Sequence, residues 1–437
     1  MSDQALQVAG SAQVLEARVT FSHQPFVRPL VLSTGPIASI TQADAVVRVR
    51  VGEVEAEGRG CIYLSDLWAW PDPAVEHADR DAAMRAYCHD VAERLPRISD
   101  QLAHPLAIGL RLHHDAIEQS PTMQPATPPA LARCVCASIF DAAVHDAVGQ
   151  ALGVSAFDLY AADQPLPEAD AAFGGVGRTF AAIRTMFSSP PRSHSPAWWI
   201  VGKADDLEQD VRPHIKKHGY FAFKLKIMGR NADEDAQRVA EVYRAARDWG
   251  INQPRLTIDS NEANPDATSV LDFLDRLTSI DRDACAALEM IEQPTGRDIQ
   301  KHAFDWSPVA ARKPVMVDEG LMTLDSMKLA REQGWSGFAL KTCKGHSFAL
   351  VAAAWAQQHG MALSLQDLTN PGLSAVHAAL FAARVPTMNG VELNSSQFTP
   401  AANTDWLDRF PDLFRVRNGM HQLPVSTTVG LGGHALP

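Results

Sequence analysis

The sequence lacks an excess of basic residues and has no long apolar run. Its 39 Lys and Arg stand against 51 Asp and Glu, which gives a formal net charge of −12. Binding to nucleic-acid phosphates through bulk positive charge is therefore excluded. No segment approaches the roughly 20 apolar residues of a membrane span, and the N-terminal residues do not read as a signal peptide. We expect a cytoplasmic protein that binds neither nucleic acid nor membranes.

Cysteines are also few. The chain has 6 in 437 residues, with no CxxC pair and no histidine partners at zinc spacing. Such scattered thiols are typical of a reduced protein, not of a disulfide framework or a zinc site. What the sequence does contain is 46% hydrophobic and 21% charged residues, the proportions of a globular protein with a large buried core.

The first part of the chain has the hydrophobic patterns of strands followed by helices. Residues 14–21 and 46–60 show strand-like alternation, which predicts a half-buried antiparallel sheet. Between them, residues 23–35 are expected to form a loop because Pro and Gly interrupt them. Helical patterns follow over residues 80–95, 98–112 and 129–152. We assign residues 1–165 to an α+β domain and interpret the Gly-, Pro- and Ser-rich segment 172–197 as a linker or loop.

The second part repeats a different unit. Eight short apolar segments alternate with helical sequence: AWWIVG, FAFKLK, RLTID, ALEMIEQP, PVMVDE, GFALK, ALSLQD and GVELN. Apolar strands alternating with helices indicate a parallel sheet covered by helices, and eight of them indicate a closed α/β barrel. We assign residues 166–399 to this barrel and residues 400–437 to a C-terminal segment that packs back on the first domain.

Most of these segments end in a charged residue. The charged ends are Lys226, Asp259, Glu292, Asp318, Lys341, Asp367 and Glu392. Because the carboxyl ends of parallel strands open onto one face of a barrel, we expect these side chains to gather at one mouth. Buried charges are costly without partners, so a series of them indicates a functional site.

Three of the charged ends form an oxygen-only set. Asp259, Glu292 and Asp318 end consecutive strands, and carboxylates are the hard ligands that suit Mg²⁺. No cysteine or histidine stands at these positions, so zinc is not expected. The simpler alternative is that each carboxylate pairs with a lysine, but three in series favour a metal site.

Lysines flank the three carboxylates. Lys224 and Lys226 are two residues apart on one strand, so their side chains share a face, and their repulsion is expected to lower the pKa of at least one. Lys341 ends a strand on the other side. A neutral lysine could take a proton from the carbon next to a metal-bound carboxylate, and lysines on both sides could remove and return it. Taken singly, each lysine could also be part of an ordinary ion pair.

Five ordered motifs carry a resemblance to the enolase superfamily and, within it, to the muconate-lactonizing-enzyme-like subgroup. They are FKLK (223–226), IDSNEA (258–263), IEQP (291–294), VDEG (317–320) and LKTCKG (340–345). The resemblance implies a (β/α)₇β modified TIM barrel with an α+β capping domain. It also implies that the three carboxylates bind Mg²⁺, that Lys226 and Lys341 are the acid and base, and that Lys224 assists. The mandelate-racemase-like subgroup fits less well, because His346 and His377 fall in helical sequence.

The resemblance implies an isomerase of the racemase or epimerase type that acts on a small-molecule carboxylate through an enolate, in a homo-oligomer. A lyase that dehydrates a hydroxy acid or sugar acid is the alternative within the same chemistry. A Schiff-base aldolase would not need the three carboxylates, and a non-catalytic binding protein would not need a complete set of competent residues.

Contacts to the rest of the substrate are harder to assign. Dipeptide epimerases resemble one another in an Asp-x-Asp on the eighth strand that grips an ammonium group, and here that strand offers Glu392 and Asn394. The capping domain offers tryptophans that could equally pack it against the barrel. The candidate substrate contacts are Asp367, Glu392, Asn394, Trp68, Trp70 and Arg28.

Overall fold

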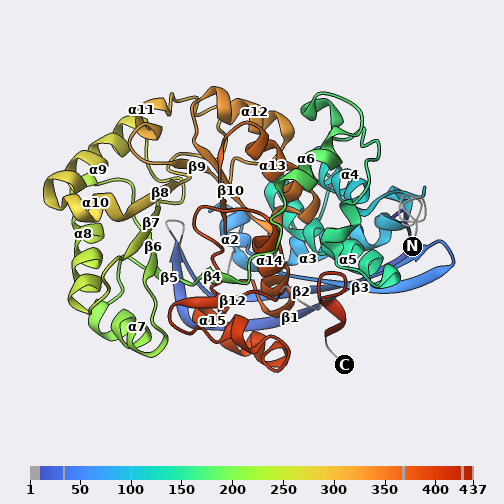
Figure 1. Ribbon diagram of the computed structural model, residues 1–437, viewed down its shortest axis with the longest axis horizontal. Helices are drawn as coiled ribbons and strands as arrows, with labels where there is room; N and C mark the ends of the chain where they lie inside the picture. The colour runs from blue at the N-terminus through green and yellow to red at the C-terminus, as the bar shows by residue number, and fades with distance from the viewer. Residues whose placement is uncertain (1–9, 33–34, 100, 367–369, 425–427, 436–437) are drawn as a thin grey trace.

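The computed structural model describes residues 10–32, 35–99, 101–366, 370–424 and 428–435. A sheet of long antiparallel strands with helices packed on it forms the capping domain, and a curled parallel sheet surrounded by helices forms the barrel (Figure 1). The fold is therefore the expected α/β barrel with an α+β capping domain.

The capping sheet has the order β1-β2-β3 and consists of β1 (Gln13–Leu32), β2 (Gly35–Val51) and β3 (Val54–Tyr63). The prediction of a loop over residues 23–35 was wrong, since β1 extends to Leu32 and pairs with β2 at residues 23–25 and 30–32. The register shifts between Pro25 and Leu30. Prolines are tolerated there because β1 is an edge strand with an irregularity.

The helices of the capping domain cover one face of this sheet. The helix predicted over residues 98–112 begins later, because Ile98 still belongs to the preceding helix and Pro105 lies in the first turn of the next one. It also ends later, at Glu118. The long helix predicted over residues 129–152 ends at Leu152, and Gly153 follows with a φ of +67°, which favours glycine. The helices are α2 (Asp66–Ala69), α3 (His77–Ile98), α4 (Pro105–Glu118) and α5 (Ala130–Leu152).

The segment interpreted as a linker contains regular structure. Within residues 172–197 lie α6 (Arg178–Met186) and β4 (His194–Pro196). The burial of Phe180 and Ile183 shows why this helix forms despite its Gly- and Ser-rich flanks: its apolar face packs beside α13. The prediction of a linker was therefore wrong for this part.

Seven of the eight expected barrel strands are present, in the spatial order β11-β10-β9-β8-β7-β6-β5. The eighth segment is not a strand, since Val391 makes only an isolated parallel bridge to Leu365. Side chains close the barrel there instead: Trp198 Nε1 donates to the Asn389 carbonyl at 2.7 Å. The strands are β5 (Trp198–Val201), β6 (Ala222–Lys226), β7 (Arg255–Asp259), β8 (Leu288–Glu292), β9 (Val315–Val317), β10 (Gly337–Leu340) and β11 (Ala362–Leu365).

Helices follow each barrel strand and cover the outer face of the sheet (Figure 1). The last two lie toward the capping domain and bury His346 and His377, as expected for helix residues. The helices are α7 (Arg212–His218), α8 (Ala232–Asp248), α9 (Ala267–Ile280), α10 (Arg282–Ala287), α11 (Ser307–Ala310), α12 (Leu324–Glu332), α13 (His346–Gln358) and α14 (Gly372–Arg384).

The C-terminal segment contacts both bodies. Its short strand β12 (Met420–Gln422) pairs with β4, and the backbone N–H groups of Leu431 and Gly433 donate to the buried carboxylate of Asp146 in α5. Two short helices precede β12: α15 (Ser395–Phe398) and α16 (Pro411–Phe414).

Five of the six cysteines are buried, and Cys285 is partly exposed. Within the described residues, no helix has the length and apolar character needed to cross a membrane.

Candidate active site

The charged side chains gather at the carboxyl ends of neighbouring barrel strands. Lys226, Asp259 and Glu292 are the last residues of β6, β7 and β8, and Asp318 and Lys341 directly follow β9 and β10. Lys226 is in register with Asp259, which is in register with Glu292. Residues in register on adjacent strands lie side by side, so the fold brings these groups into one row.

Lys224 lies at the centre of the cluster. Its ammonium nitrogen contacts three carboxylates: Glu292 at 2.8 Å, Glu392 at 3.1 Å and Asp259 at 3.3 Å. Burial lowers the pKa of Lys224, but these carboxylates raise it well above its usual value. The expected lowering by Lys226 is therefore wrong for Lys224, because opposite charges outweigh the neighbouring lysine.

Lys226 occupies one end of the row. Its nitrogen lies 2.5 Å from Asp259 Oδ2 and donates to Asn261 Oδ1 at 3.0 Å. Asn261, with a φ of +46°, also donates its backbone N–H to Asp259 Oδ1 at 2.7 Å. Burial raises the pKa of Asp259, yet Lys226 and Lys224 lower it far below its usual value. Asp259 is thus held ionised in a fixed orientation.

Lys341 occupies the other end. Its nitrogen lies 3.0 Å from Asp318 Oδ2 and 3.4 Å from Glu292 Oε1. Lys344 binds the same aspartate, at 3.1 Å from Oδ1 and through the backbone carbonyl. Trp68 of the capping domain lies beside both lysines, with its ring 5.5 Å from the nitrogen of Lys341 and 5.9 Å from that of Lys344. This end of the row therefore lies under the capping domain.

Burial governs the carboxyl groups between the lysines. It raises the pKa of Glu292 to about 7, against the opposing effect of Lys224. It also raises the pKa of Glu319 to about 8, with a further contribution from Asp318. For Asp318 itself, burial is outweighed by Lys341 and Lys344, so its pKa is lowered. Burial thus favours the neutral form of Glu292 and Glu319, whereas the lysines favour the ionised form of Asp318.

The chemistry of the three carboxylates fits a hard cation such as Mg²⁺. Glu292 Oε2 and Asp318 Oδ1 are buried oxygens that pair with lysine nitrogens, at 2.8 Å from Lys224 and 3.1 Å from Lys344. In this conformation the ammonium groups of Lys224 and Lys341 stand between the carboxylates. Accordingly, across the described ranges no three His, Cys, Asp or Glu side chains are already arranged around a common metal position. A cation would compete with the lysines for these oxygens.

Two of the candidate substrate contacts take part in the framework of the site. Glu392 is buried and binds Lys224 at 3.1 Å, and Asn394 donates to the Trp198 carbonyl at 3.4 Å, where the barrel closes. Asn394 Oδ1 accepts no hydrogen bond within the described chain. Asp367 lies outside the described residues.

The tryptophans join the capping domain to the barrel. Trp68 is buried and its Nε1 donates to Glu319 Oε1 at 2.7 Å, while Arg297 donates to the Trp68 carbonyl at 3.1 Å. Arg297 is itself held by Glu262, which follows β7. Trp70 is buried in the hydrophobic core. Both rings thus serve packing, and Trp68 also reaches the charged row.

Comparison with known protein families assigns the chain to one of them. The family model described as Enolase C-terminal domain-like matches residues 206–434, slightly more than half of the chain. The chain belongs to the enolase superfamily. No curated protein matches its sequence.

Solved structures of the enolase superfamily share the fold over nearly the whole chain. The muconate lactonizing enzyme from Pseudomonas fluorescens, complexed with muconolactone, is 20% identical, with 96% of each chain covered and a TM-score of 0.63. The dipeptide epimerase from Enterococcus faecalis, complexed with Mg and L-Leu-L-Tyr, is 15% identical, with 96% of this chain and 99% of that chain covered and a TM-score of 0.63. An enolase from Bradyrhizobium, complexed with magnesium and mandelic acid, is 17% identical, with 97% and 95% covered and a TM-score of 0.63.

A cavity of about 380 Å³ opens beside Lys226 in this enolase-superfamily chain. The end of β1, with Arg28, forms one wall, and the residues after β5 and β6 form the others. Figure 1 shows this end of the β1–β2 hairpin reaching the barrel beside β5. Arg28 therefore lies in a wall of the cavity that Lys226 borders.

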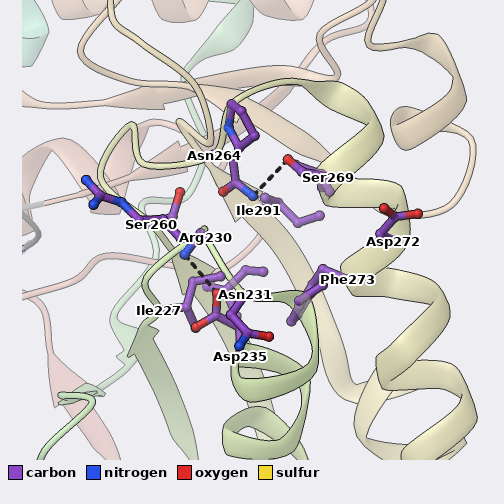
Figure 2. A pocket seen from close by; sticks show the side chains of 15 residues that line it. Ile227, Arg230, Asn231, Asp235, Ser260, Asn264, Ser269, Asp272, Phe273 and Ile291 are labelled. Atoms are coloured by element: carbon purple, nitrogen blue, oxygen red, sulfur yellow. Dashed lines mark hydrogen bonds between the residues drawn. The ribbon is translucent and has the colours of Figure 1, made fainter.

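A second cavity, of about 330 Å³, lies between α8 and α9 and is lined by polar side chains such as Asn264 and Ser269 (Figure 2). Ile258 and Ile291 also line it, and each precedes a carboxylate of the row by one residue. Because successive side chains on a strand point to opposite faces, this cavity lies behind the strands and does not open onto the charged row.

Sequence reasoning missed several residues that hold the charged row in place. Asn261 and Lys344 contact Asp259 and Asp318 directly. Four of the missed residues lie within a motif that carried the resemblance, and Gln366 follows the strand segment at 362–365, so their polarity was visible but their partners were not. The missed residues are Asn261, Gln293, Glu319, Lys344 and Gln366.

Proposed function

We propose that this protein is a Mg²⁺-dependent isomerase that abstracts the proton alpha to a substrate carboxylate and returns it, as a racemase or epimerase does. The observation that carries this proposal is the position of Lys226 and Lys341 at opposite ends of a row of three carboxylates. Two bases on opposite sides are what exchange of a proton between two faces of a planar intermediate needs.

Each group in the row has a distinct task in this reaction. Mg²⁺, held by Asp259, Glu292 and Asp318, would stabilise the charge that develops on the carboxylate of the enolate. Lys226 would take the alpha proton from one face, and Lys341 would deliver one to the other face. Lys224, with its raised pKa, stays charged and adds electrostatic stabilisation.

The ligands of solved neighbours support the choice of metal and substrate class. Two of these neighbours are complexed with magnesium together with mandelic acid or a dipeptide, both of which carry a carboxylate. Trp68 covers one end of the row, which would limit the access of water to an enolate.

The proposal is tested by incubating the protein with a library of carboxylic acids in D₂O, with Mg²⁺ or with EDTA. We expect deuterium at the alpha carbon of at least one acid, only with the metal, and a product of unchanged atomic composition apart from the exchanged hydrogen. Loss of water from the product would instead identify a lyase. No exchange with any acid in the presence of Mg²⁺ would contradict the proposal.

A further inference from the structure

The segment between β10 and α13 is in contact with two helices of the capping domain. This segment contains Lys341 and the 3₁₀ turn Thr342–Lys344, and the last residue of the turn binds Asp318. Helix α4 packs against α13, and α5 packs against both the turn and α13. The capping domain therefore reaches the Lys341 end of the charged row through these helices as well as through Trp68.

His113 of α4 lies between two loops of the barrel. Its Nδ1 lies 2.9 Å from the carbonyl oxygen of Lys344, after β10, and its Nε2 lies 2.8 Å from that of Met322, after β9. The ring is buried and stacks on Phe348 of α13, with centroids 4.4 Å apart and an interplanar angle of 6°. This His113 bridge joins the loops that follow two neighbouring strands of the barrel.

The chemistry of the bridge makes the histidine the donor. A carbonyl oxygen only accepts hydrogen bonds, so each of the two contacts needs an N–H of the ring. A neutral imidazole has one N–H and holds one of the carbonyls, whereas the imidazolium has two and holds both. Removing the ring nitrogens would leave both carbonyls without this donor, which is unfavourable in a buried position.

Asp141 of α5 holds the same segment at its other side. Its Oδ2 accepts the Ser347 N–H at 2.8 Å, and its Oδ1 accepts the Ser347 hydroxyl at 2.7 Å. Gly345, with a φ of +118°, lies close to both capping-domain side chains: a Cβ there would come within 3.3 Å of Asp141 Oδ2 and 3.6 Å of His113 Nδ1. The glycine thus allows the backbone of the turn to approach the capping domain.

We propose that His113 is a positioning residue that holds the turn after β10, and with it Lys341, against the loop after β9. This inference rests on the proposed function, in which Lys341 acts on one face of the enolate. The contacts of His113 are with backbone carbonyls, so it acts through Lys344, whose ammonium binds Asp318. A misplacement of about 1 Å can cost about 100-fold in rate, so loss of the bridge slows the step at Lys341.

The test uses variants that remove or keep single donors. His113→Phe keeps a ring that can stack on Phe348 but removes both nitrogens. The amide nitrogen of asparagine can replace Nδ1, which faces Lys344, whereas that of glutamine can replace Nε2, which faces Met322. With Mg²⁺, His113→Phe should slow alpha-deuterium exchange of the enantiomer that Lys341 deprotonates by roughly 10- to 100-fold, and that of the other enantiomer much less. His113→Asn should recover more of the lost rate than His113→Gln.

His104→Phe is the matched control. His104 is also a buried histidine of the capping domain, at the N-cap of the same helix, and its Nε2 lies 3.1 Å from the backbone carbonyl of Leu159. That carbonyl lies outside the loops after β9 and β10. His104→Phe should lower the midpoint of thermal unfolding, as His113→Phe does, but should leave the ratio of the two exchange rates unchanged. An unchanged ratio in His113→Phe would overturn the inference.

Backbone hydrogen exchange, followed by mass spectrometry in EDTA, separates this inference from the proposed function because it needs no substrate. Peptides that cover residues 318–324 and 341–349 should exchange roughly tenfold faster in His113→Phe than in the unmodified protein, whereas residues 222–228 should keep their protection. Loss of protection in a protein that exchanges no acid would support the bridge and contradict the isomerase. Exchange of acids with unchanged protection and an unchanged ratio would support the isomerase and overturn the bridge. If His113→Phe does not fold, equal recovery in His113→Asn and His113→Gln would overturn it.

Discussion

The two ends of the charged row differ in their access to solvent. At one end the side chain of Lys226 is 12% exposed and borders a cavity, and it pairs with the barrel residues Asp259 and Asn261. At the other end Lys341 is 4% exposed and lies beside Trp68 of the capping domain. The two proposed bases are therefore chemically alike but physically unequal.

This inequality indicates how a substrate is placed. The open end offers space for the part of the substrate beyond its reacting carbon, whereas the closed end has the indole of Trp68 and the ammonium of Lys344 close to Lys341. Whatever the substrate is, its bulk is expected on the Lys226 side. The capping domain, through Trp68, is expected to influence the Lys341 side more strongly.

The largest effect is expected from removing each base separately. Lys226→Met and Lys341→Met should each reduce isomerisation by roughly 10²- to 10⁴-fold, the contribution of general acid–base catalysis. Each variant should still exchange deuterium into one enantiomer, and the two variants should retain opposite enantiomers. Alpha-exchange of the separated enantiomers, followed by NMR, measures this.

The control for this comparison is Lys203→Met, which changes a half-exposed lysine of the same cavity that is paired with Glu234. It should exchange both enantiomers. If Lys226→Met and Lys341→Met retained the same enantiomer, the assignment of the two lysines to opposite faces would be wrong.

The second effect concerns stability without metal. Lys341→Met leaves Glu292 and Asp318 with fewer cations in a fully buried position, and removing one partner of a buried pair costs about 3–5 kcal/mol. Lys226→Met should cost less, because Lys226 is more exposed and Asp259 keeps the bonds of Asn261. Denaturant unfolding in EDTA measures the difference, and equal losses would contradict the inequality of the two ends.

The arrangement of the barrel could be predicted from sequence because the pattern is local and repeated. Each apolar segment that becomes a strand is bounded by helical sequence, and seven of the eight form strands. The eighth makes only an isolated backbone bridge, and the side chain of its Asn394 bonds to the Trp198 carbonyl of β5. The extension of β1 past Pro25 was also hidden, since pairing with β2 overrides the local preference of proline.

The site was predictable to the extent that its residues end strands. Asp259 and Glu292 do so, and parallel pairing leaves them side by side. Lys344 could not be placed in the same way, because it lies three residues beyond Lys341 in a 3₁₀ turn, and only tertiary structure turns it toward Asp318. The contact of Trp68 with Glu319 likewise joins segments more than 200 residues apart, which no local pattern encodes.

A smaller effect is expected from the metal itself. Mg²⁺ at a hundred times its Kd should stabilise the protein by about 2.7 kcal/mol, the value for a ligand that binds only the folded state. Glu292→Gln should abolish this gain. Glu289→Gln, on the same strand but paired with Arg255, should preserve it. Thermal unfolding with and without Mg²⁺ measures both, and a gain that persists in Glu292→Gln would place the metal elsewhere.

The smallest effect is expected where the capping domain reaches the closed end. Trp68→Phe keeps an aromatic ring beside Lys341 but removes the N–H that binds Glu319 at 2.7 Å. An unmatched buried acceptor costs about 1–3 kcal/mol, so the midpoint of denaturant unfolding should fall accordingly.

Because the ring beside Lys341 is disturbed and Lys226 is not, exchange of the enantiomer that depends on Lys341 should slow by more than exchange of the other. Trp70→Phe leaves the contact with Glu319 intact. It should change the ratio of the two exchange rates and the midpoint of unfolding less than Trp68→Phe does. Equal slowing of both enantiomers in Trp68→Phe would mean that the capping domain acts on the whole row and not on its closed end.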